Sequence, residues 1–408
     1  MAPGGTGGVE QFGTRVRWGL GCLWAVGICG VLAGTGLVMS ILIHPHHGDH
    51  HRVAPVQMGE DFYDYASLID TEPNDHVLEA LQEPFLDFVM KPNSDAAQRK
   101  RLENPEHWDE RFYMHTSASV QQHAGSWAFF IRLEAVADDY AKTLTELRDK
   151  GIPEIAAAIP YAESQYRSSS QSRACAKGPW QFMPETAYRV GQDSSSNFQV
   201  TDCKLKGDGG IWSPTARAVP PLKERVYADL SQGAGRMHCR IIKCRIDNRA
   251  DLALSTGAAA FTLGEVWSDE RIRESGAAVQ IMLLSHKTGY HDERFGQRRK
   301  TNVLQSLKIW QKNVEEDEWA QFYGDNIKCD SPHVSGGMGR CGGKFSAETQ
   351  HYAYPIVAVH MLAACYYGQN HGQRQPFAAY AQYSAGDGYC NALNIPSKEE
   401  VLARRGRH

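Results

Sequence analysis

A run without charge divides the chain near its N-terminus. From Trp18 to Ile43 no residue carries a charge, and Arg15 and Arg17 precede the run. At roughly 1.5 Å per residue, a helix of this length crosses the ~30 Å hydrocarbon core of a bilayer. Positive charge on this flank favours an N-terminus in the cytoplasm. We therefore expect a cytoplasmic tail at 1–17, one transmembrane anchor at 18–43 in the inner (cytoplasmic) membrane, and the remaining chain in the periplasm.

Two other interpretations of this uncharged run have less support from the sequence. A cleaved signal peptide has a shorter apolar core, and no small-x-small cleavage site is evident near the end of the run. A lipid-modified cysteine is disfavoured because Cys22 and Cys29 lie inside the run without the residues expected before such a site.

The net charge of the chain constrains which class of molecule it binds. The formal net charge is −4 over 408 residues, with 22% charged and 42% hydrophobic residues. A near-neutral chain of this kind lacks the basic surface that nucleic-acid binding requires. The composition therefore predicts a folded domain whose partner is not nucleic acid.

Eight cysteines follow the run: Cys175, Cys203, Cys239, Cys244, Cys329, Cys341, Cys365 and Cys390. An even number in a chain exported across a membrane indicates disulfides. Zinc is the alternative, but only Cys239 and Cys244 are close enough together to suggest it. The single pairing that we expect is Cys329 with Cys341.

The segment 44–125 is expected to be a linker and an N-terminal extension. It opens with five histidines between His44 and His51, which suit either a metal site or a polar linker. We favour the linker because no scaffold is evident to hold a coordination geometry. No metal or other cofactor is predicted.

Helical periodicity dominates from Trp127 onward. An apolar stripe runs from Phe130 to Leu147 and ends at Gly151, a candidate helix C-cap, while Pro153 opens the next helix. Further helices are expected at 252–267, 277–285 and 352–367. No sustained period-two segment competes with them, so the fold class is predicted to be mainly α.

One acid lies on an apolar helix face. Ile152, Ile155, Ile159 and Glu163 recur at spacings of three and four. Burial against isoleucines disfavours a charged carboxylate, so Glu163 is expected to keep its proton where an exposed glutamate has lost it. This is the requirement for a general acid. The alternative is that Pro160 kinks the helix and turns Glu163 into solvent.

The chain around this acid resembles the lytic transglycosylases of lysozyme-like fold, most closely the membrane-bound D type. In that family a helix ends in Glu-Ser, a serine follows nine residues after the glutamate, and a Gly-x-x-Gln-x-x-Pro loop comes next. Glu163, Ser172 and Gln181 match this spacing. The resemblance continues through three later blocks, at 247–251, 255–260 and 348–358.

The resemblance implies a lysozyme-like helical domain at 126–375 with a groove that holds Glu163. Two insertions, at about 192–246 and 291–345, interrupt it, and a C-terminal extension follows at 376–408. Most of the eight cysteines that follow the uncharged run fall in these insertions, so we expect disulfides to stabilise both insertions.

The activity implied is cleavage of peptidoglycan glycan strands between N-acetylmuramic acid and N-acetylglucosamine. In the family one glutamate first gives a proton to the glycosidic oxygen and then takes the proton of the C6 hydroxyl, which closes a 1,6-anhydro ring. Glu163 is the residue to which this double role carries over. A role in cell-wall remodelling follows from the same resemblance.

Further positions correspond to substrate-binding residues of the family: Ser164, Ser172, Gln181, Met183 and Tyr352. Each has an ordinary alternative. The serines are common loop or helix-end residues, and Met183 and Tyr352 are residue types found in cores.

One position departs from the family pattern. Where the family has Ala-Tyr-Asn-x-Gly, this chain has Ser285-His286-Lys287-Thr288-Gly289. His286 thus stands where a tyrosine approaches the catalytic acid; if charged it favours ionised Glu163, and if neutral it has a hydrogen bond to offer. A hydrolytic muramidase therefore remains an alternative, as does a weakly active peptidoglycan-binding scaffold whose insertions dock an envelope protein.

Overall fold

The computed structural model describes residues 73–90, 92, 110–172, 175–193, 197–206, 210–212, 239, 241–274, 278–288, 293–294, 297–298, 340–341, 345–346, 352–385 and 388–406. All of them belong to the unit that spans Gln57–His408. The expected anchor at 18–43, the histidine-rich segment and Cys329 lie outside the described residues. Within the described ranges, no helix has both the length and the apolar character needed to cross a membrane.

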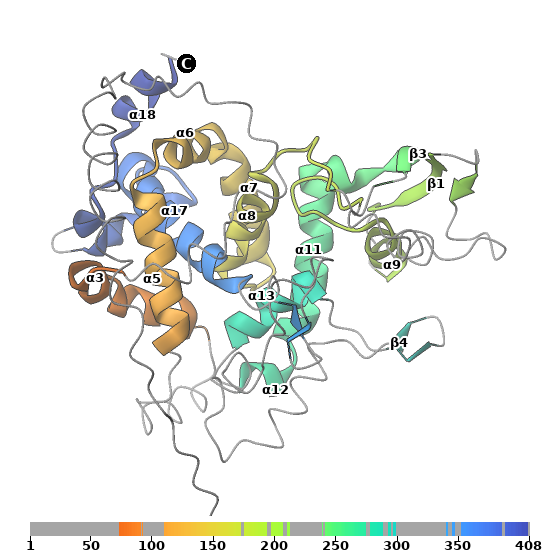
Figure 1. Ribbon diagram of the computed structural model, residues 1–408, viewed down its shortest axis with the longest axis horizontal. Helices are drawn as coiled ribbons and strands as arrows, with labels where there is room; N and C mark the ends of the chain where they lie inside the picture. Colours follow the sequence, from red (N-terminus) through yellow and green to blue (C-terminus); the bar gives the residue numbers. More distant parts are fainter. Residues whose placement is uncertain are drawn as a thin grey trace, which may run out of the picture. The chain divides into compact units, whose positions relative to one another are not determined.

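The described part of the chain is mainly helical, as predicted (Figure 1). Its α-helices are α3 (Asp75–Phe85), α5 (Glu110–Ala124), α6 (Trp127–Ala135), α7 (Ala137–Asp149), α8 (Ile159–Ser164), α9 (Pro184–Asp193), α11 (Leu252–Trp267), α12 (Glu270–Arg273), α13 (Ala278–Thr288), α17 (Ala353–His371) and α18 (Lys398–Arg405). Shorter 3₁₀ helices are η3 (Glu154–Ala158), η4 (Asn248–Ala250), η5 (Phe377–Tyr383) and η6 (Tyr389–Leu393), and η1 (Leu86–Met90) is a π-helix.

Helix α17 forms the centre of the core. Every residue from Ala353 to Gly368 is buried, and the helix contacts α5, α8, α13, η1, η3 and η5. A helix enclosed on all sides has no polar face, which is why this stretch reads as apolar throughout. Figure 1 shows α17, in blue, between α5 and α8. Its one buried imidazole, His360, bonds to the Tyr140 hydroxyl across 3.2 Å.

The apolar stripe after Trp127 forms two helices rather than the single continuous helix expected. Val136 lies between α6 and α7 with φ of −114°, and the chain bends there. Gly151 follows α7 with φ of +66°, in the left-handed region that favours glycine, so the predicted cap is confirmed.

The helix before Glu163 is also divided. Residues Glu154–Ala158 form η3, and α8 then starts at Ile159 with Pro160 in its first turn. Proline fits this position because the first helical N–H groups have no partner within the helix. Pro160 therefore lies at the start of α8 and does not interrupt the helix that carries Glu163.

Segments outside the expected helical domain contribute to the same core. Phe85 of α3, Phe112 of α5 and Val401 of α18 are all almost fully buried in one cluster. Helix α18 packs on α6, where Glu134 accepts bonds from Tyr366, His371 and Lys398. Burial opposes the charge on Glu134, but these partners outweigh it and lower the pKa of the carboxyl group.

A small antiparallel sheet, with strand order β2-β1-β3, lies in the first expected insertion. Its strands are β1 (Val200–Leu205), β2 (Ile211–Trp212) and β3 (Ile241–Asp247). The sequence analysis missed it because β3 is exposed or half-exposed at every position after Ile241, so it lacks the alternation that marks a strand. Pairs of two-residue strands are also present. β4 (Glu293–Arg294) pairs with β5 (Gln297–Arg298), and β6 (Arg340–Cys341) pairs with β7 (Phe345–Ser346).

Three disulfides are present in the described residues: Cys175–Cys239, Cys203–Cys244 and Cys365–Cys390. The zinc alternative is wrong because Cys239 and Cys244 belong to two different disulfides. Cys203 faces Cys244 across β1 and β3, and Cys175–Cys239 ties the insertion to the loop before α9. Closing a loop of 64 residues stabilises a fold by roughly 4 kcal/mol in the chain-entropy model.

Candidate active site

Glu163 occupies the last turn of α8, which ends abruptly. Gln165 and Tyr166 have φ of 53° and 60°, so the chain leaves the helix through two left-handed residues. The Arg132 guanidinium holds this exit by donating to the Gln165 carbonyl. The side chain of Glu163 is half-buried, less than its place on the isoleucine stripe suggested.

Tyr352 reaches this acid from the start of α17. Its hydroxyl donates to Oε1 of Glu163 at 2.7 Å, which joins residues 189 positions apart in the chain. The Lys287 ammonium lies 5.6 Å from the centre of the Tyr352 ring. Tyr352 therefore orients the carboxyl group, and Lys287 of α13 lies near the tyrosine ring.

Ser164 lies in the contact between α8 and the loop that follows. Only 2% of it is exposed, and its hydroxyl lies 3.1 Å from the Pro160 carbonyl and 2.9 Å from the Pro179 carbonyl. One hydroxyl proton serves two acceptors, both within the protein. The structure thus places Ser164 against protein backbone.

The loop from Ser170 to Phe182 folds back beside α8. Gly178, with φ of +80°, packs so closely against residue 249 that a Cβ added there would lie 1.7 Å from the Arg249 carbonyl oxygen. No residue with a side chain fits this position. Ser172 is half-exposed and caps the inner turn, its hydroxyl accepting from the Ala176 N–H at 3.0 Å.

Two predicted contact residues follow at the rim of the loop. Gln181 has φ of 48° and donates through Nε2 to the Gly178 carbonyl at 2.7 Å. Its Oε1 has no hydrogen-bond partner among the residues that the structure describes. Met183 is 38% exposed, which is uncommon for so large an apolar side chain.

Trp180, in contrast, belongs to the core. It is fully buried, and its indole N–H donates to the Thr256 hydroxyl at 3.0 Å. This contact joins the loop to α11, whose predicted bounds, 252–267, are confirmed.

His286 supports the loop from α13. Its Nε2 lies 3.0 Å from the Trp180 carbonyl, and since a carbonyl only accepts, Nε2 carries the proton. Burial lowers the pKa of His286, against the opposing influence of Glu163, so the ring is neutral near pH 7. A neutral ring has no second N–H, so the idea that neutral His286 donates to Glu163 does not fit.

Arg249 is a site residue that sequence reasoning missed. Only 1% of it is exposed, and it donates to the carbonyl oxygens of Cys175 and Phe182 at 2.6 and 3.1 Å. It also forms two bonds to Asp247, which Lys177 contacts at 2.9 Å. One buried guanidinium therefore binds the loop at Cys175 and at its end, Phe182.

Asp247 completes this network. Burial opposes its ionisation, but Arg249 and then Lys177 outweigh that effect and lower the pKa of Asp247. The only advance signal for these residues was that 247–251 is one of the blocks of the resemblance. As for metals, no group of three or more His, Cys, Asp or Glu gathers at one point in the described ranges.

Comparison with known families points to one class of enzyme. Residues 144–204 match the family model described as the transglycosylase SLT domain. The matched segment runs from α7 to β1 and includes Glu163, Ser172 and Gln181. No curated protein matches the chain. The mainly helical, disulfide-bonded structure is consistent with a lysozyme-like domain, and the match supports a lytic transglycosylase that acts on peptidoglycan.

Proposed function

We propose that this protein cleaves the β-1,4 bond between N-acetylmuramic acid and N-acetylglucosamine in peptidoglycan without adding water, and so leaves 1,6-anhydromuramyl ends. The observation that carries the proposal is the hydrogen bond from Tyr352 to Glu163, within reach of the loop that lies in the matched segment. The biological role that fits this chemistry is cell-wall remodelling.

In the first step Glu163 is a general acid. Its carboxyl proton passes to the glycosidic oxygen, the bond from that oxygen to C1 breaks, and the departing sugar keeps a free hydroxyl. The acetamido oxygen of the muramic acid bonds to C1 and takes up the positive charge. Tyr352 keeps the carboxyl group oriented by its bond to Oε1.

In the second step Glu163 is a base. As a carboxylate it takes the proton of the C6 hydroxyl, whose oxygen attacks C1 and displaces the acetamido oxygen. The ring closes, and Glu163 regains its proton. The reaction consumes no water and needs no metal.

The loop and its rim supply the substrate contacts. In this proposal the Gln181 Oε1 and the half-exposed Ser172 bind polar groups of the sugar, and the exposed Met183 packs against an apolar face of the ring. Ser164 positions the loop through Pro179 instead of touching sugar. Gly178 and Arg249 hold the loop in shape.

The hydrolytic alternative requires a second carboxylate to position water or form a covalent intermediate. Asp247 is the carboxylate of the loop network, but it is bound to Arg249 and Lys177. A transglycosylase, which needs one acid, therefore fits the loop better.

His286 is proposed to shape the pH profile. Because burial lowers the pKa of His286, its ring charges only in acid, and a charge beside Glu163 favours the ionised form of that carboxyl group and weakens it as an acid. His286→Tyr should therefore raise activity at acid pH relative to neutral pH. An unmoved pH–rate curve would count against this role.

The proposed location is the inner membrane, with the catalytic domain in the periplasm and 18–43 as a single anchor. The uncharged run and its flanking arginines support the anchor, and the three disulfides support an oxidising compartment. Fractionation of cells, with protease protection of the two chain ends, tests this arrangement.

The decisive experiment is mass spectrometry of fragments released from purified peptidoglycan by the full chain. The wild type should release muropeptides one water lighter than reducing-end fragments, and Glu163→Gln should release none. Glu399→Gln, at an exposed position of α18, is the matched control and should behave as wild type. Ordinary reducing ends would indicate a hydrolase, and binding to the wall without any product would indicate a scaffold protein.

A further inference from the structure

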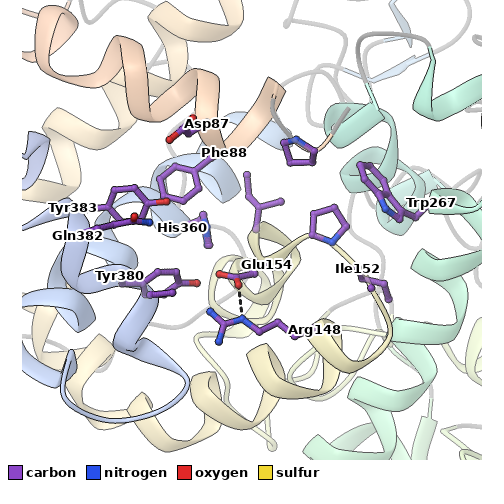
Figure 2. Close-up of a pocket in the computed structure, with 15 residues that line it drawn as sticks. Asp87, Phe88, Arg148, Ile152, Glu154, Trp267, His360, Tyr380, Gln382 and Tyr383 are labelled. Atoms are coloured by element: carbon purple, nitrogen blue, oxygen red, sulfur yellow. Dashed lines mark hydrogen bonds and ion pairs between the residues drawn. The ribbon is translucent and has the colours of Figure 1, made fainter. Parts of the chain in front are cut away.

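A second cavity lies away from Glu163. It has a volume of about 520 Å³ and contains none of the residues assigned to the active site. Its walls come from η1, from the turn between α7 and η3, from α17 and from η5 (Figure 2). A volume of this order accommodates a ligand of drug or disaccharide size.

Three buried polar atoms of residues that line this cavity have no hydrogen-bond partner in the described part of the chain: the Tyr380 hydroxyl, Nη2 of Arg148 and Nε2 of His360. The other nitrogens of Arg148 and His360 are used. Arg148 binds Glu154 and the Pro376 carbonyl, and Nδ1 of His360 bonds to Tyr140. Because buried polar groups are nearly always paired, three unpaired ones beside one cavity suggest a polar occupant.

The charges exclude a strongly anionic occupant. Arg148 and Glu154 neutralise one another, and Asp87 adds a further carboxylate at the opposite wall. Burial lowers the pKa of His360 to about 4, so this ring contributes no positive charge at neutral pH. A phosphate or sulfate would face one compensated cation and an excess of negative charge.

Four aromatic side chains also line the cavity, among aliphatic ones: Phe88, Trp267, Tyr380 and Tyr383. Figure 2 shows the Tyr380 hydroxyl directed toward the Glu154 carboxylate, and burial raises the pKa of this tyrosine, which keeps its proton. Aromatic faces beside donors and acceptors suit a neutral polyol, whose C–H faces are apolar and whose hydroxyls both donate and accept.

We propose that this cavity binds one or two sugar residues of a glycan strand without cleaving them. The inference rests on the proposed function, since that activity supplies a long glycan as substrate. A strand held at two places on one chain dissociates less readily, because the second contact forms at a high effective concentration. The cavity therefore retains the enzyme on polymeric wall.

The first test locates a bound sugar. The full chain carrying Glu163→Gln is incubated with a soluble tetramer of N-acetylglucosamine, and amide hydrogen exchange is followed by mass spectrometry. Slower exchange in peptides that cover 148–155 and 377–383 supports the proposal. Slower exchange confined to the segment around Glu163 and the 170–182 loop overturns the proposal. Free lysine is the comparison ligand: if it slows exchange in the cavity peptides and the sugar tetramer does not, the proposal is also overturned.

The second test removes the aromatic wall. In the Glu163→Gln background, the double change Trp267→Ala and Tyr383→Ala should weaken binding to insoluble wall about tenfold. Trp127→Ala is the control, because this half-buried tryptophan lies under Arg404, 3.8 Å from its guanidinium carbon, and does not line the cavity. If the double variant fails to fold, Gln382→Ala, at an exposed position of the same wall, replaces it and should weaken binding several-fold.

Cleavage of short soluble fragments separates this proposal from the proposed function. With an intact Glu163, the cavity variants should cleave such fragments as fast as the wild type and lose rate only on polymeric wall. If the cavity variants match the wild-type rate on short fragments and on polymeric wall alike, the cavity proposal is overturned while the transglycosylase stands. Wild-type protein that binds the tetramer in the cavity yet releases no product overturns the transglycosylase while the cavity stands.

Discussion

Two glutamates stand near opposite ends of the same helical segment and have opposite surroundings. Glu154, at the start of η3, is bound by the guanidinium of Arg148. Glu163, in the last turn of α8, has one hydrogen-bond partner among the described residues, the uncharged hydroxyl of Tyr352. Both side chains are partly buried.

The difference shows what a buried acid needs in order to work as one. The Arg148 guanidinium, a permanent cation, contacts the Glu154 carboxylate directly and holds it in an ion pair. The Tyr352 hydroxyl orients the Glu163 carboxyl group through one hydrogen bond and brings no charge into contact with it. The neighbours in space, more than the apolar stripe in sequence, separate the structural glutamate from the candidate acid.

The largest expected effect comes from removing each carboxylate in turn. Glu163→Gln should lower the turnover rate by about 10²- to 10⁴-fold, as loss of a general acid does, with unchanged thermal stability. Glu154→Gln should keep turnover and lower the free energy of unfolding by about 1–3 kcal/mol, because Arg148 loses its partner in a partly exposed site. Turnover assays and thermal melts of both variants check the pair. The reverse pattern would exchange the roles of the two residues.

Arg249→Met tests a second arginine, which binds Asp247 and the loop carbonyls where Arg148 binds Glu154. It should lower the free energy of unfolding by about 3–5 kcal/mol, because Asp247 and two carbonyls lose a buried donor. Activity should fall with it. Arg245→Met, an exposed ion pair on β3, should change stability by less than about 1 kcal/mol. Denaturant unfolding measures both, and equal effects would mean that burial of Arg249 is not what holds the loop.

Acid should weaken the Glu154 end of the segment through His360. Its pKa in the fold is about 4, below the ordinary value of 6.5, so the unfolded chain binds a proton more readily. Stability is therefore complete above about pH 6.5 and declines as the pH falls toward 4, by up to about 3 kcal/mol. His360→Gln should flatten this part of the stability curve, whereas His76→Gln, at an exposed position, should not. Unfolding free energies measured from pH 7 to 4 decide the matter, and an identical slope in His360→Gln would exclude the residue.

Tyr352→Phe should give the smallest effect. It removes the one neutral donor from Glu163 and should lower kcat about tenfold, corresponding to ~1.4 kcal/mol, with little change in KM. Tyr188→Phe, a half-buried tyrosine of α9, is the control and should keep its kcat. If Tyr352→Phe matches the wild type, the hydroxyl has no part in orienting the acid.

The helices around the site were largely predictable because their apolar periodicity is local information. The bounds of α11 and the cap at Gly151 agree with the pattern. Helix α13 begins one residue later than expected and extends to Thr288, and α17 reaches His371. A helix end depends on the tertiary contacts available to its last turn, which a periodicity does not contain.

The contacts that give each side chain its role were not predictable. Nothing local marks Arg249 as buried, because two of the carbonyl groups to which it donates hydrogen bonds lie 67 and 74 residues away in the chain. The partner of Glu154 lies only six residues away, yet one turn of backbone decides whether Arg148 reaches it. The pairing of the cysteines and the cavity near α17 likewise depend on segments that only the fold brings together.

The Cys175–Cys239 bond also determines what a protease can separate. A single cut of the backbone anywhere between these two residues leaves both fragments joined through sulfur, so the nicked protein migrates as one band until a reductant divides it. The loop beside Glu163 therefore remains covalently attached to both parts of the chain after such a cut. A chain cut once between these cysteines therefore keeps its two pieces together as long as the disulfide is oxidised.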